Sequence, residues 1–392
     1  MREEDPLPDG AGGLSRDDER IVLPGDRPRI ALIRLGALGD CVYTFPLVSA
    51  CKARLPNAEV TWIVEARNRD VPGLHPGVDA VSVVDTRRWR RDIRSGRLGQ
   101  VAEEIRAIRR SWAAKPFDLV LDPQGSIKSG AIAWLTRAPA RVGFARAACR
   151  EGMNVLFTTH RVSAPADGHI VRKNLSLLAP LGIRVEHPAF GIRLSPEAKS
   201  RVSSLLQRAG IGSRDRVVGI HPGAGHARKR WDPDRYARVA DALQEGGAAR
   251  VILTAGPGEE TLLQAVASQM RGVPVGLPPL PAEDLAALLS RCDLLVAGDT
   301  GPLHLAAALG CPTVAIYGPS DPIRVAPVGE GHRVLKKPCA CGWEPGLYFN
   351  RRCPDAPCLG AITVEEVVAA ARETLGRPES PRVAVLARPG QP

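Results

Sequence analysis

Residues 293–322 read DLLVAGDTGPLHLAAALGCPTVAIYGPSDP, and this stretch restricts the possible folds more than any other part of the chain. It contains an apolar run, a glycine turn, a helical pattern and a second apolar run, at Leu294–Ala297, Gly298–Gly301, Leu303–Leu309 and Thr313–Tyr317. Short apolar runs on either side of a helical segment are typical of parallel strands joined by a crossover helix. The stretch therefore predicts one strand–helix–strand unit of a parallel sheet.

The glycine turn of this unit is a candidate anion site. It follows the carboxyl end of the first strand, where the first backbone N–H groups of the next helix are unpaired and point outward. Such groups suit a phosphate, because the helix dipole adds to their attraction for negative charge. The plainer interpretation is that Asp299 or Thr300 only caps the helix. The stretch by itself leaves both interpretations open.

The same alternation of strands and helices runs through most of the 392 residues and breaks near 184–195, where RVEHPAFGIRLS has no clear period. Two similar halves with Gly-rich turns after their strands predict an α/β protein with two doubly wound domains and ligands in the cleft between them. We expect a flexible tail, an N-terminal domain, a C-terminal domain, a C-terminal helix and a disordered tail, at residues 1–27, 28–190, 191–362, 363–376 and 377–392.

The charge of the chain favours anionic partners. Lys and Arg outnumber Asp and Glu by 53 to 42, which gives a net charge of +11. This balance favours nucleic acid, an anionic membrane face or phosphorylated substrates, although an Arg-rich composition throughout would explain it as well. The most basic stretch, TRRWRRDIRSGR at residues 86–97, contains a single aromatic residue, Trp89, which is too few for base stacking. We therefore expect no nucleic-acid partner.

Three further glycine-containing loops follow predicted strands: RLGALGD, HPGAGHARKRW and TAGPGEE, at residues 34–40, 221–231 and 254–260. Their spacing does not match the dinucleotide fingerprint, which argues against a nicotinamide enzyme. Asp40 is either an N-cap or a base facing the cleft, and one carboxylate can do both. Lys229 is placed to neutralise a leaving phosphate, or it belongs to a solvated basic loop. Glu259 or Glu260 either binds ribose hydroxyls or stabilises a helix first turn.

Four cysteines cluster late in the chain, at Cys339, Cys341, Cys353 and Cys358. The N-terminus lacks the basic flank and apolar core of a signal peptide, and no apolar run is long enough to span a membrane, so we expect a cytosolic protein. In that compartment, clustered thiols favour metal over disulfides. The spacing C-x-C, eleven residues, C-x₄-C is not a standard finger. A structural Zn or Fe site and four reduced thiols are the alternatives left open.

These motifs, taken in order, resemble those of glycosyltransferase family 9, the ADP-heptose:lipopolysaccharide heptosyltransferases. The resemblance extends from Arg29 to about Leu375 and includes LGALGDCVYTFPLVSACKARLPNAEVTWIVE, RRWRR, DLVLDPQGSIKSGAIA, RVGF, HPGAG followed by KRW, AGDTGPLHLAAALGCPTVAIYGPSDP and the cysteine cluster. Each motif is weak alone, but their order and spacing are specific. The resemblance implies a GT-B fold, in which two Rossmann-like domains face each other across a cleft, with the acceptor on the N-terminal domain and the donor on the C-terminal one.

The resemblance also implies roles for individual residues. Asp40 matches the proposed catalytic base of the family. The implied donor residues are Lys229, Glu259 or Glu260, Asp299, Thr300, Gly301 and His304. The basic side chains implied to bind acceptor phosphates are Arg87, Arg88, Arg90, Arg91, Lys128, Arg146 and Arg150. No cofactor is implied for the chemistry, because backbone dipoles and Lys229 offset the charge of the leaving ADP.

The resemblance finally implies a function and a place in the cell. The expected reaction is inverting transfer of a heptose from ADP-heptose to a phosphorylated lipopolysaccharide core acceptor of the lipid A–Kdo type. The expected location is cytoplasmic, peripheral at the anionic inner face of the inner membrane. One alternative keeps the fold but changes the nucleotide sugar, or uses a protein or another glycan as acceptor. An alternative of a different class is a non-catalytic nucleotide-sugar-binding protein, against which the presence of Asp40 argues.

Overall fold

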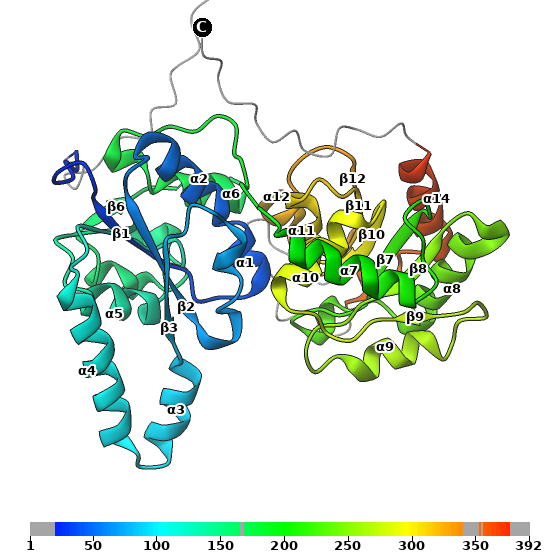
Figure 1. Cartoon of the computed structure of the whole chain (residues 1–392), viewed down its shortest axis with the longest axis horizontal. Coiled ribbons are helices and arrows are strands. Elements are labelled where there is room, and N and C mark those ends of the chain that lie inside the picture. Colours follow the sequence, from blue (N-terminus) through cyan, green and yellow to red (C-terminus); the bar gives the residue numbers. More distant parts are fainter. Residues whose placement is uncertain (1–19, 165–167, 340–352, 354–355, 377–392) are drawn as a thin grey trace, which may run out of the picture.

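The computed structural model describes residues 20–164, 168–339, 353 and 356–376. In this part of the chain two lobes lie side by side, each built on one six-stranded sheet (Figure 1). We call the lobe around the first sheet the N-lobe and the lobe around the second sheet the C-lobe. The chain crosses between them near 193–195, where the N–H of Arg193 donates to the carbonyl of Leu74 and the N–H of Ser195 donates to the carboxylate of Glu283. The crossing lies just after the expected domain boundary at 190.

The N-lobe sheet is parallel throughout and has the strand order β3–β2–β1–β4–β5–β6. Its strands are β1 (Arg29–Ile33), β2 (Glu59–Glu65), β3 (Ala80–Val84), β4 (Leu119–Leu121), β5 (Ala140–Phe144) and β6 (His160–Val162). The α-helices of this lobe are α1 (Leu38–Val42), α2 (Phe45–Arg54), α3 (Thr86–Arg94), α4 (Leu98–Ala114), α5 (Ile127–Leu135) and α6 (Ile170–Ser176). Its 3-10 turns are η1 (Ala66–Asn68), η2 (Pro72–Leu74), η3 (Arg146–Ala148), η4 (Gly152–Leu156) and η5 (Ala179–Leu181).

The C-lobe repeats this plan with the strand order β12–β11–β10–β7–β8–β9, again parallel. Its strands are β7 (Val217–His221), β8 (Arg250–Leu253), β9 (Val275–Gly276), β10 (Leu294–Gly298), β11 (Thr313–Tyr317) and β12 (His332–Lys336). Its α-helices are α7 (Pro196–Arg208), α8 (Pro233–Gln244), α9 (Glu260–Ala267), α10 (Ala282–Arg291), α11 (Gly301–Ala308), α12 (Pro322–Val325), α13 (Pro357–Gly360) and α14 (Val364–Leu375). Its 3-10 turns are η6 (Ala227–Lys229) and η7 (Glu245–Gly247).

The central strands are apolar along their whole length, because helices cover both faces of each sheet. All five residues of β7, β10 and β11 are buried, as are six of the seven residues of β2. Strands of this kind read as continuous apolar runs, which is what a parallel sheet buried on both faces requires. The two doubly wound sheets confirm the predicted α/β fold class.

The strand order reverses beside the first strand of each sheet. β1 lies between β2 and β4, and β7 lies between β8 and β10. In doubly wound sheets, ligands bind outside the carboxyl ends of the strands at such a reversal. The loops after β1 and β7 carry RLGALGD and HPGAG, and the loop after β10 carries GDTG. The topology therefore brings three of the predicted glycine loops to the edges where a ligand is expected.

Some local predictions are wrong. The sequence from Asp40 to Leu55 predicts one amphipathic helix, but the structure has two helices, α1 and α2, separated by Tyr43 and Thr44. Pro46 stands in the first turn of α2, where its missing N–H costs no helical hydrogen bond. The edge strand β12 was not expected, because its sequence HRVLK is partly exposed along its length and lacks a clear alternation.

The basic stretch at residues 86–97 is helical in its first part, where a loop or helix start was expected. Asp85 caps α3 by accepting a hydrogen bond from the N–H of Arg88. Helices α3 and α4 form a hairpin that projects from the lower end of the N-lobe in the view of Figure 1. None of the helices in the described residues is both long and apolar enough to cross a membrane.

Candidate active site

Three charged or polar side chains meet beneath the first turn of α11. The Nζ of Lys229 lies 2.5 Å from Oδ2 of Asp299, and the Nε2 of His304 lies 3.1 Å from Oδ1 of the same carboxylate. Asp299 and His304 are each 4% exposed at their side chains, and Lys229 is 13% exposed. The structure therefore brings together Lys229 from the loop after β7, Asp299 from the loop after β10 and His304 from α11.

The ionised form of Asp299 is the stable one in this environment. Burial by itself would raise the pKa of this carboxyl, since it removes the charge from water. The hydrogen bond to His304 and the charge of Lys229 outweigh burial and hold the pKa of Asp299 well below its usual range. The fixed carboxylate orients both the ammonium of Lys229 and the imidazole of His304.

The helix-cap interpretation of the glycine turn is wrong in its simple form. Thr300 occupies the N-cap position of α11 with an extended backbone, but its side chain makes no capping hydrogen bond. Asp299 directs its carboxylate to Lys229 and His304 instead. The N–H groups of Gly301 and Leu303 in the first turn therefore have no side-chain cap, which is the arrangement an anion site needs.

The start of α1 in the N-lobe packs directly on the start of α11 in the C-lobe. A Cβ atom on Gly39 would lie 2.9 Å from Cδ2 of His304, and one on Gly301 would lie 2.8 Å from Cβ of Leu38. These glycines are required by this close approach of the lobes. Neither has a positive φ, so close packing, and not a left-handed backbone, requires a glycine at these positions.

A hydrogen-bonded chain continues across the lobe contact. The hydroxyl of Tyr43 lies 2.7 Å from Nδ1 of His304 and donates to the carbonyl of Val325 at 2.7 Å. Nearby, the Nε2 of His169 lies 2.9 Å from the carbonyl oxygen of Ala326. Tyr43 and His169 of the N-lobe thus bind the consecutive carbonyls of Val325 and Ala326, and Tyr43 also contacts His304.

Asp40 follows Gly39 directly, so it lies beside the contact between α1 and α11. Its Oδ1 is 2.7 Å from Nη2 of Arg34, and its side chain keeps 23% exposure. Arg34 is nearly fully buried and its Nη1 donates to the carbonyl of Pro123 at 2.6 Å. The N-cap of α1 is Ala37, so the capping role considered for Asp40 is wrong. The carboxylate is instead oriented by Arg34.

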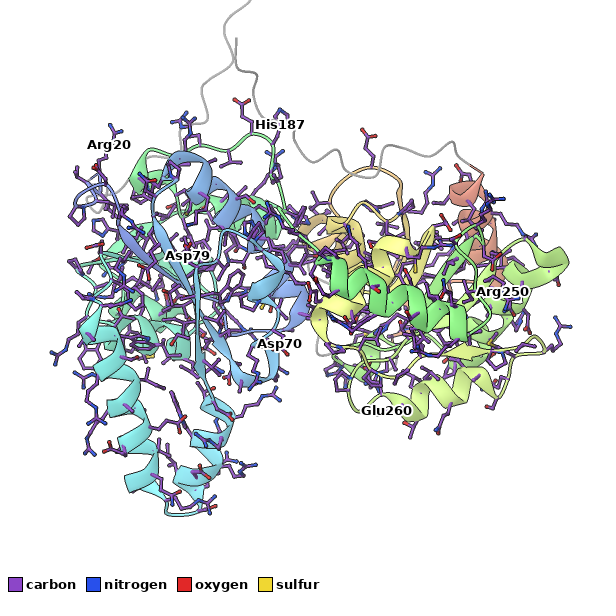
Figure 2. All side chains as sticks on the ribbon, viewed as in Figure 1. Arg20, Asp70, Asp79, His187, Arg250 and Glu260 are labelled. Atoms are coloured by element: carbon purple, nitrogen blue, oxygen red, sulfur yellow. The ribbon has the colours of Figure 1, made fainter. Side chains whose placement is uncertain are left out.

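The structure distinguishes the two glutamates of TAGPGEE. Glu259 accepts hydrogen bonds from the N–H groups of Ala224 and Gly256, at 3.1 Å each, and from Arg230. It therefore joins the loops that follow β7 and β8. Glu260 accepts from the N–H of Gly258 and lies at the surface of the C-lobe (Figure 2). Of the two, Glu259 is the one that lies at the edge of the sheet where the topology leads us to expect a ligand.

A buried histidine stands beside Glu259 at the end of β7. His221 is 2% exposed, and its Nδ1 lies 3.0 Å from Oγ1 of Thr254. Burial lowers the pKa of His221 to about 4, so the imidazole is neutral near pH 7. Its Nε2 is 3.8 Å from Oε2 of Glu259, and with a neutral ring this contact is no ion pair.

The predicted acceptor-binding cations lie in the N-lobe. Six of them are exposed, on α3 and in or beside η3: Arg87, Arg88, Arg90, Arg91, Arg146 and Arg150. Arg88 pairs with Glu104 of α4. Lys128 donates at 2.9 Å to the buried carboxylate of Glu65 and at 2.9 Å to the hydroxyl of Thr86. Lys128 therefore connects α5 to the base of the α3–α4 hairpin.

The cysteine cluster is only partly within the described residues. Cys341 lies outside them, while the Sγ atoms of Cys339 and Cys353 are 3.9 Å apart. Burial, followed by the hydrogen bond to Cys339, raises the pKa of Cys358 to about 11. Within the described part of the chain, no group of three or more His, Cys, Asp or Glu side chains is arranged to hold a metal ion. The metal site stays a prediction.

The sequence of the chain matches that of a known protein family. Residues 105–344, more than half of the chain, match the sequence model of glycosyltransferase family 9 (heptosyltransferase). The chain belongs to glycosyltransferase family 9. It is therefore a glycosyltransferase, as the motifs predicted, and the two sheets are the two Rossmann-like domains of a GT-B fold.

Curated proteins similar to this family 9 chain are lipopolysaccharide heptosyltransferases. Lipopolysaccharide heptosyltransferase 1 of Pseudomonas aeruginosa strain PAO1 is 26% identical over 377 residues, covering 90% of this chain and 100% of that protein. Lipopolysaccharide heptosyltransferase 1 of Escherichia coli K12 is 26% identical over 311 residues, covering 79% and 94%.

Solved structures agree on the fold. A glycosyltransferase family 9 protein from Veillonella parvula has a TM-score of 0.76 at 24% identity and covers 89% of this chain and 97% of its own. E. coli heptosyltransferase WaaC with ADP has a TM-score of 0.71 at 23% identity, covering 88% and 99%.

Tyr43 and Arg34, which contact His304 and Asp40, were not predicted from the sequence. Tyr43 is 261 positions from His304 in the chain, and Arg34 is buried at the end of a strand. One signal was available for Arg34, because an arginine at the end of a buried strand needs a nearby acceptor. Tyr43 carries no comparable local signal.

Proposed function

We propose that the protein transfers a heptose from ADP-heptose to a phosphorylated lipopolysaccharide core acceptor of the lipid A–Kdo type, with inversion at the anomeric carbon. Membership of family 9 and the names of the curated relatives support this substrate class. The observation that carries the proposal is the buried Lys229–Asp299–His304 cluster, which lies against the helix of Asp40 across the lobe contact. In this proposal the first turn of α11 is the anion site, and the carboxylate of Asp40, beside the contact between the lobes, is its reaction partner.

On the donor side, the diphosphate lies at the first turn of α11. The N–H groups after Thr300 and the ammonium of Lys229 stabilise its charge. Asp299 holds Lys229 in place, and His304 stands next to both. Glu259 has two backbone partners that order the loops after β7 and β8, and it meets the ribose hydroxyls.

On the acceptor side, Asp40 is the general base. An alcohol has a pKa far above 7, so its proton must leave as its oxygen attacks the anomeric carbon. Asp40 takes that proton while the bond between the anomeric carbon and the phosphate oxygen breaks, and ADP leaves with the electron pair. Lys229 and the amides of α11 stabilise the charge on ADP, so these steps use groups of the chain itself. One displacement inverts the anomeric centre.

The acceptor phosphates are bound by the exposed arginines of α3 and η3. Their guanidinium groups suit bidentate contact with phosphate. Residues 20–195 hold 28 Lys and Arg against 15 Asp and Glu, whereas residues 196–392 hold 23 against 20. The excess of positive charge therefore lies in the half that is proposed to receive the anionic acceptor, at the cytoplasmic face of the inner membrane.

A donor and acceptor panel tests this proposal. ADP-heptose is compared with other ADP-, GDP- and UDP-sugars, each with and without a phosphorylated core acceptor, and both hydrolysis and transfer are scored. Preference for a different nucleotide sugar, or transfer only to a protein or another glycan, would replace the substrate assignment. Binding of ADP-heptose without turnover on any acceptor would identify a non-catalytic binder.

The base is tested by Asp40→Asn, which keeps the size of the side chain. We expect turnover to fall by on the order of 10²–10⁴, because a positioned general base contributes that much. Affinity for ADP should stay nearly unchanged, since the donor groups lie on the C-lobe. Wild-type turnover in Asp40→Asn would remove Asp40 from the mechanism.

The cysteines Cys339, Cys341, Cys353 and Cys358 are proposed to hold a structural Zn or Fe. Elemental analysis of protein purified without added metal tests this, and Cys358→Ser is the matched variant because Cys358 is buried near Cys339. We expect close to one metal ion per chain, and its loss in the variant. Metal far below one equivalent would leave four reduced thiols.

A further inference from the structure

Four large apolar side chains are exposed on two neighbouring elements of the N-lobe. On α5 these are Ile127 and Trp134, exposed by 41% and 59%, and on η4 they are Met153 and Leu156, exposed by 57% and 69%. We call this surface the α5–η4 patch. Single exposed apolar residues are ordinary, but a group of four large ones on a polar protein marks an interaction surface.

The two elements of the patch pack directly on each other. Residues 127, 130 and 134 fall on one face of α5, because they are spaced by three and four positions. At the middle of that face, a Cβ on Gly130 would lie 2.7 Å from the ring of Phe157, which ends η4. The side chain of Asn154 donates to the carbonyl of Ser126 at 2.8 Å, which fixes η4 against the start of α5. The apolar side chains on both elements therefore share one surface region.

The surroundings of the patch are strongly basic. Residues 127–161 contain six basic side chains and one acidic side chain, Glu151. The basic ones are Lys128, Arg137, Arg141, Arg146, Arg150 and Arg161. The single carboxylate accepts a hydrogen bond from the backbone N–H of Ile127. An apolar centre inside a positive region matches a surface that has negative charge above an apolar interior.

We propose that the α5–η4 patch docks on the surface of an anionic lipid bilayer. Trp134 would lie at the headgroup level, as interfacial tryptophans do, and Leu156 and Met153 would reach the acyl chains below it. Arginines around the patch would meet the lipid phosphates, as basic side chains near an anionic membrane surface do. A second copy of the chain fits less well, because a symmetric contact through this patch would bring two identical basic regions together.

The patch is close to the proposed acceptor site. Lys128, in the first turn of α5, bonds to Thr86, the first residue of the helix that carries Arg87 and Arg90. Docking at α5 would therefore hold the arginines of α3 near the headgroup layer. This step rests on the proposed function, since a lipid-linked acceptor is what makes the position useful, but bilayer binding is measurable without donor or acceptor.

The test is sedimentation of the full chain with vesicles of phosphatidylcholine and phosphatidylglycerol in equal parts, without any sugar substrate. The variant is Trp134→Ser with Leu156→Ser. The matched control is Val22→Ser with Val273→Ser, two aliphatic side chains that are exposed by 87% and 79% outside the patch. We expect wild type and control to bind, and the patch variant to lose at least about tenfold in affinity, since two buried apolar side chains are removed.

Several results would overturn the proposal. The patch variant could sediment as well as wild type, or the control could lose as much. Wild type could bind vesicles of pure phosphatidylcholine equally well, which would show that the patch has no preference for anionic lipid. Light scattering could show that wild type is a dimer and the patch variant a monomer, which would identify the patch as a contact between two copies of the chain. Transfer to a delipidated core acceptor, measured on the same proteins, reports on the proposed function separately and should be equal in all three.

Discussion

Replacing Asp299 by Asn should destabilise the protein strongly, because it leaves the ammonium of Lys229 buried without its counter-charge. The two side chains are 4% and 13% exposed and their charged atoms are 2.5 Å apart. With an effective dielectric constant of about 20, the attraction at this distance is about 7 kcal/mol. Desolvation of both groups opposes it, so the net cost of deleting one partner of such a pair is about 3–5 kcal/mol.

The assay is urea unfolding followed by circular dichroism, with Lys229→Met and the double variant measured beside Asp299→Asn. We expect the double variant to be less destabilised than the sum of the two single ones, with a coupling energy of about 0.5–3 kcal/mol. Glu103→Gln is the control, because Glu103 pairs with Arg110 at 2.8 Å but is 58% exposed. Strong coupling of Asp299 and Lys229 is refuted if Asp299→Asn loses no more stability than Glu103→Gln. It is also refuted if the losses in Asp299→Asn and Lys229→Met add up to the loss in the double variant.

The remaining predictions concern pH, the lobe contact and the acceptor. The pKa of Asp299 in the folded state lies below its unfolded value of about 4, so the ionised carboxylate stabilises the fold fully above that pH and less as the pH falls further. The free energies of unfolding of wild type and Asp299→Asn should therefore converge in acid unfolding curves at low pH. A difference that stays constant with pH would contradict this. Tyr43→Phe removes the bonds to His304 and the Val325 carbonyl and should weaken ADP binding about two- to tenfold by calorimetry, with an unchanged affinity as the opposing result. Arg87→Glu with Arg90→Glu should raise the KM for the acceptor far more than the KM for the donor, and equal rises in steady-state kinetics would remove these arginines from the acceptor site.

Most of the fold could be predicted because its information is local. The strand β11 has the predicted bounds Thr313–Tyr317, and the C-terminal helix predicted at 363–376 is α14, since apolar runs and helical periodicity end at clear turn residues. The edge strands β6 and β12 were missed, because a short strand with exposed side chains lacks the apolar signal that marks a buried one.

The site could be predicted only in parts. Lys229 and Asp299 were candidates from their glycine loops and His304 from the family resemblance, but nothing local says that one carboxylate binds the other two side chains. The contacts made by Arg34 and Tyr43 depend on how distant segments pack, so no pattern in a short stretch predicts them. The choice between Glu259 and Glu260 likewise required the positions of the loops after β7 and β8.

The lobe contact through Gly39 and Gly301 has a consequence for how the protein can move. At Gly39 and Gly301 the lobes approach so closely that an added Cβ would meet the side chains of His304 and Leu38, so neither position has room for a larger residue while the lobes are in contact. Opening must break the bonds of Tyr43 and His169 to the carbonyls of Val325 and Ala326 together, since these carbonyls are consecutive. Two ligands that both bind more tightly when these bonds are formed would strengthen each other's binding, and each would do so by the same factor.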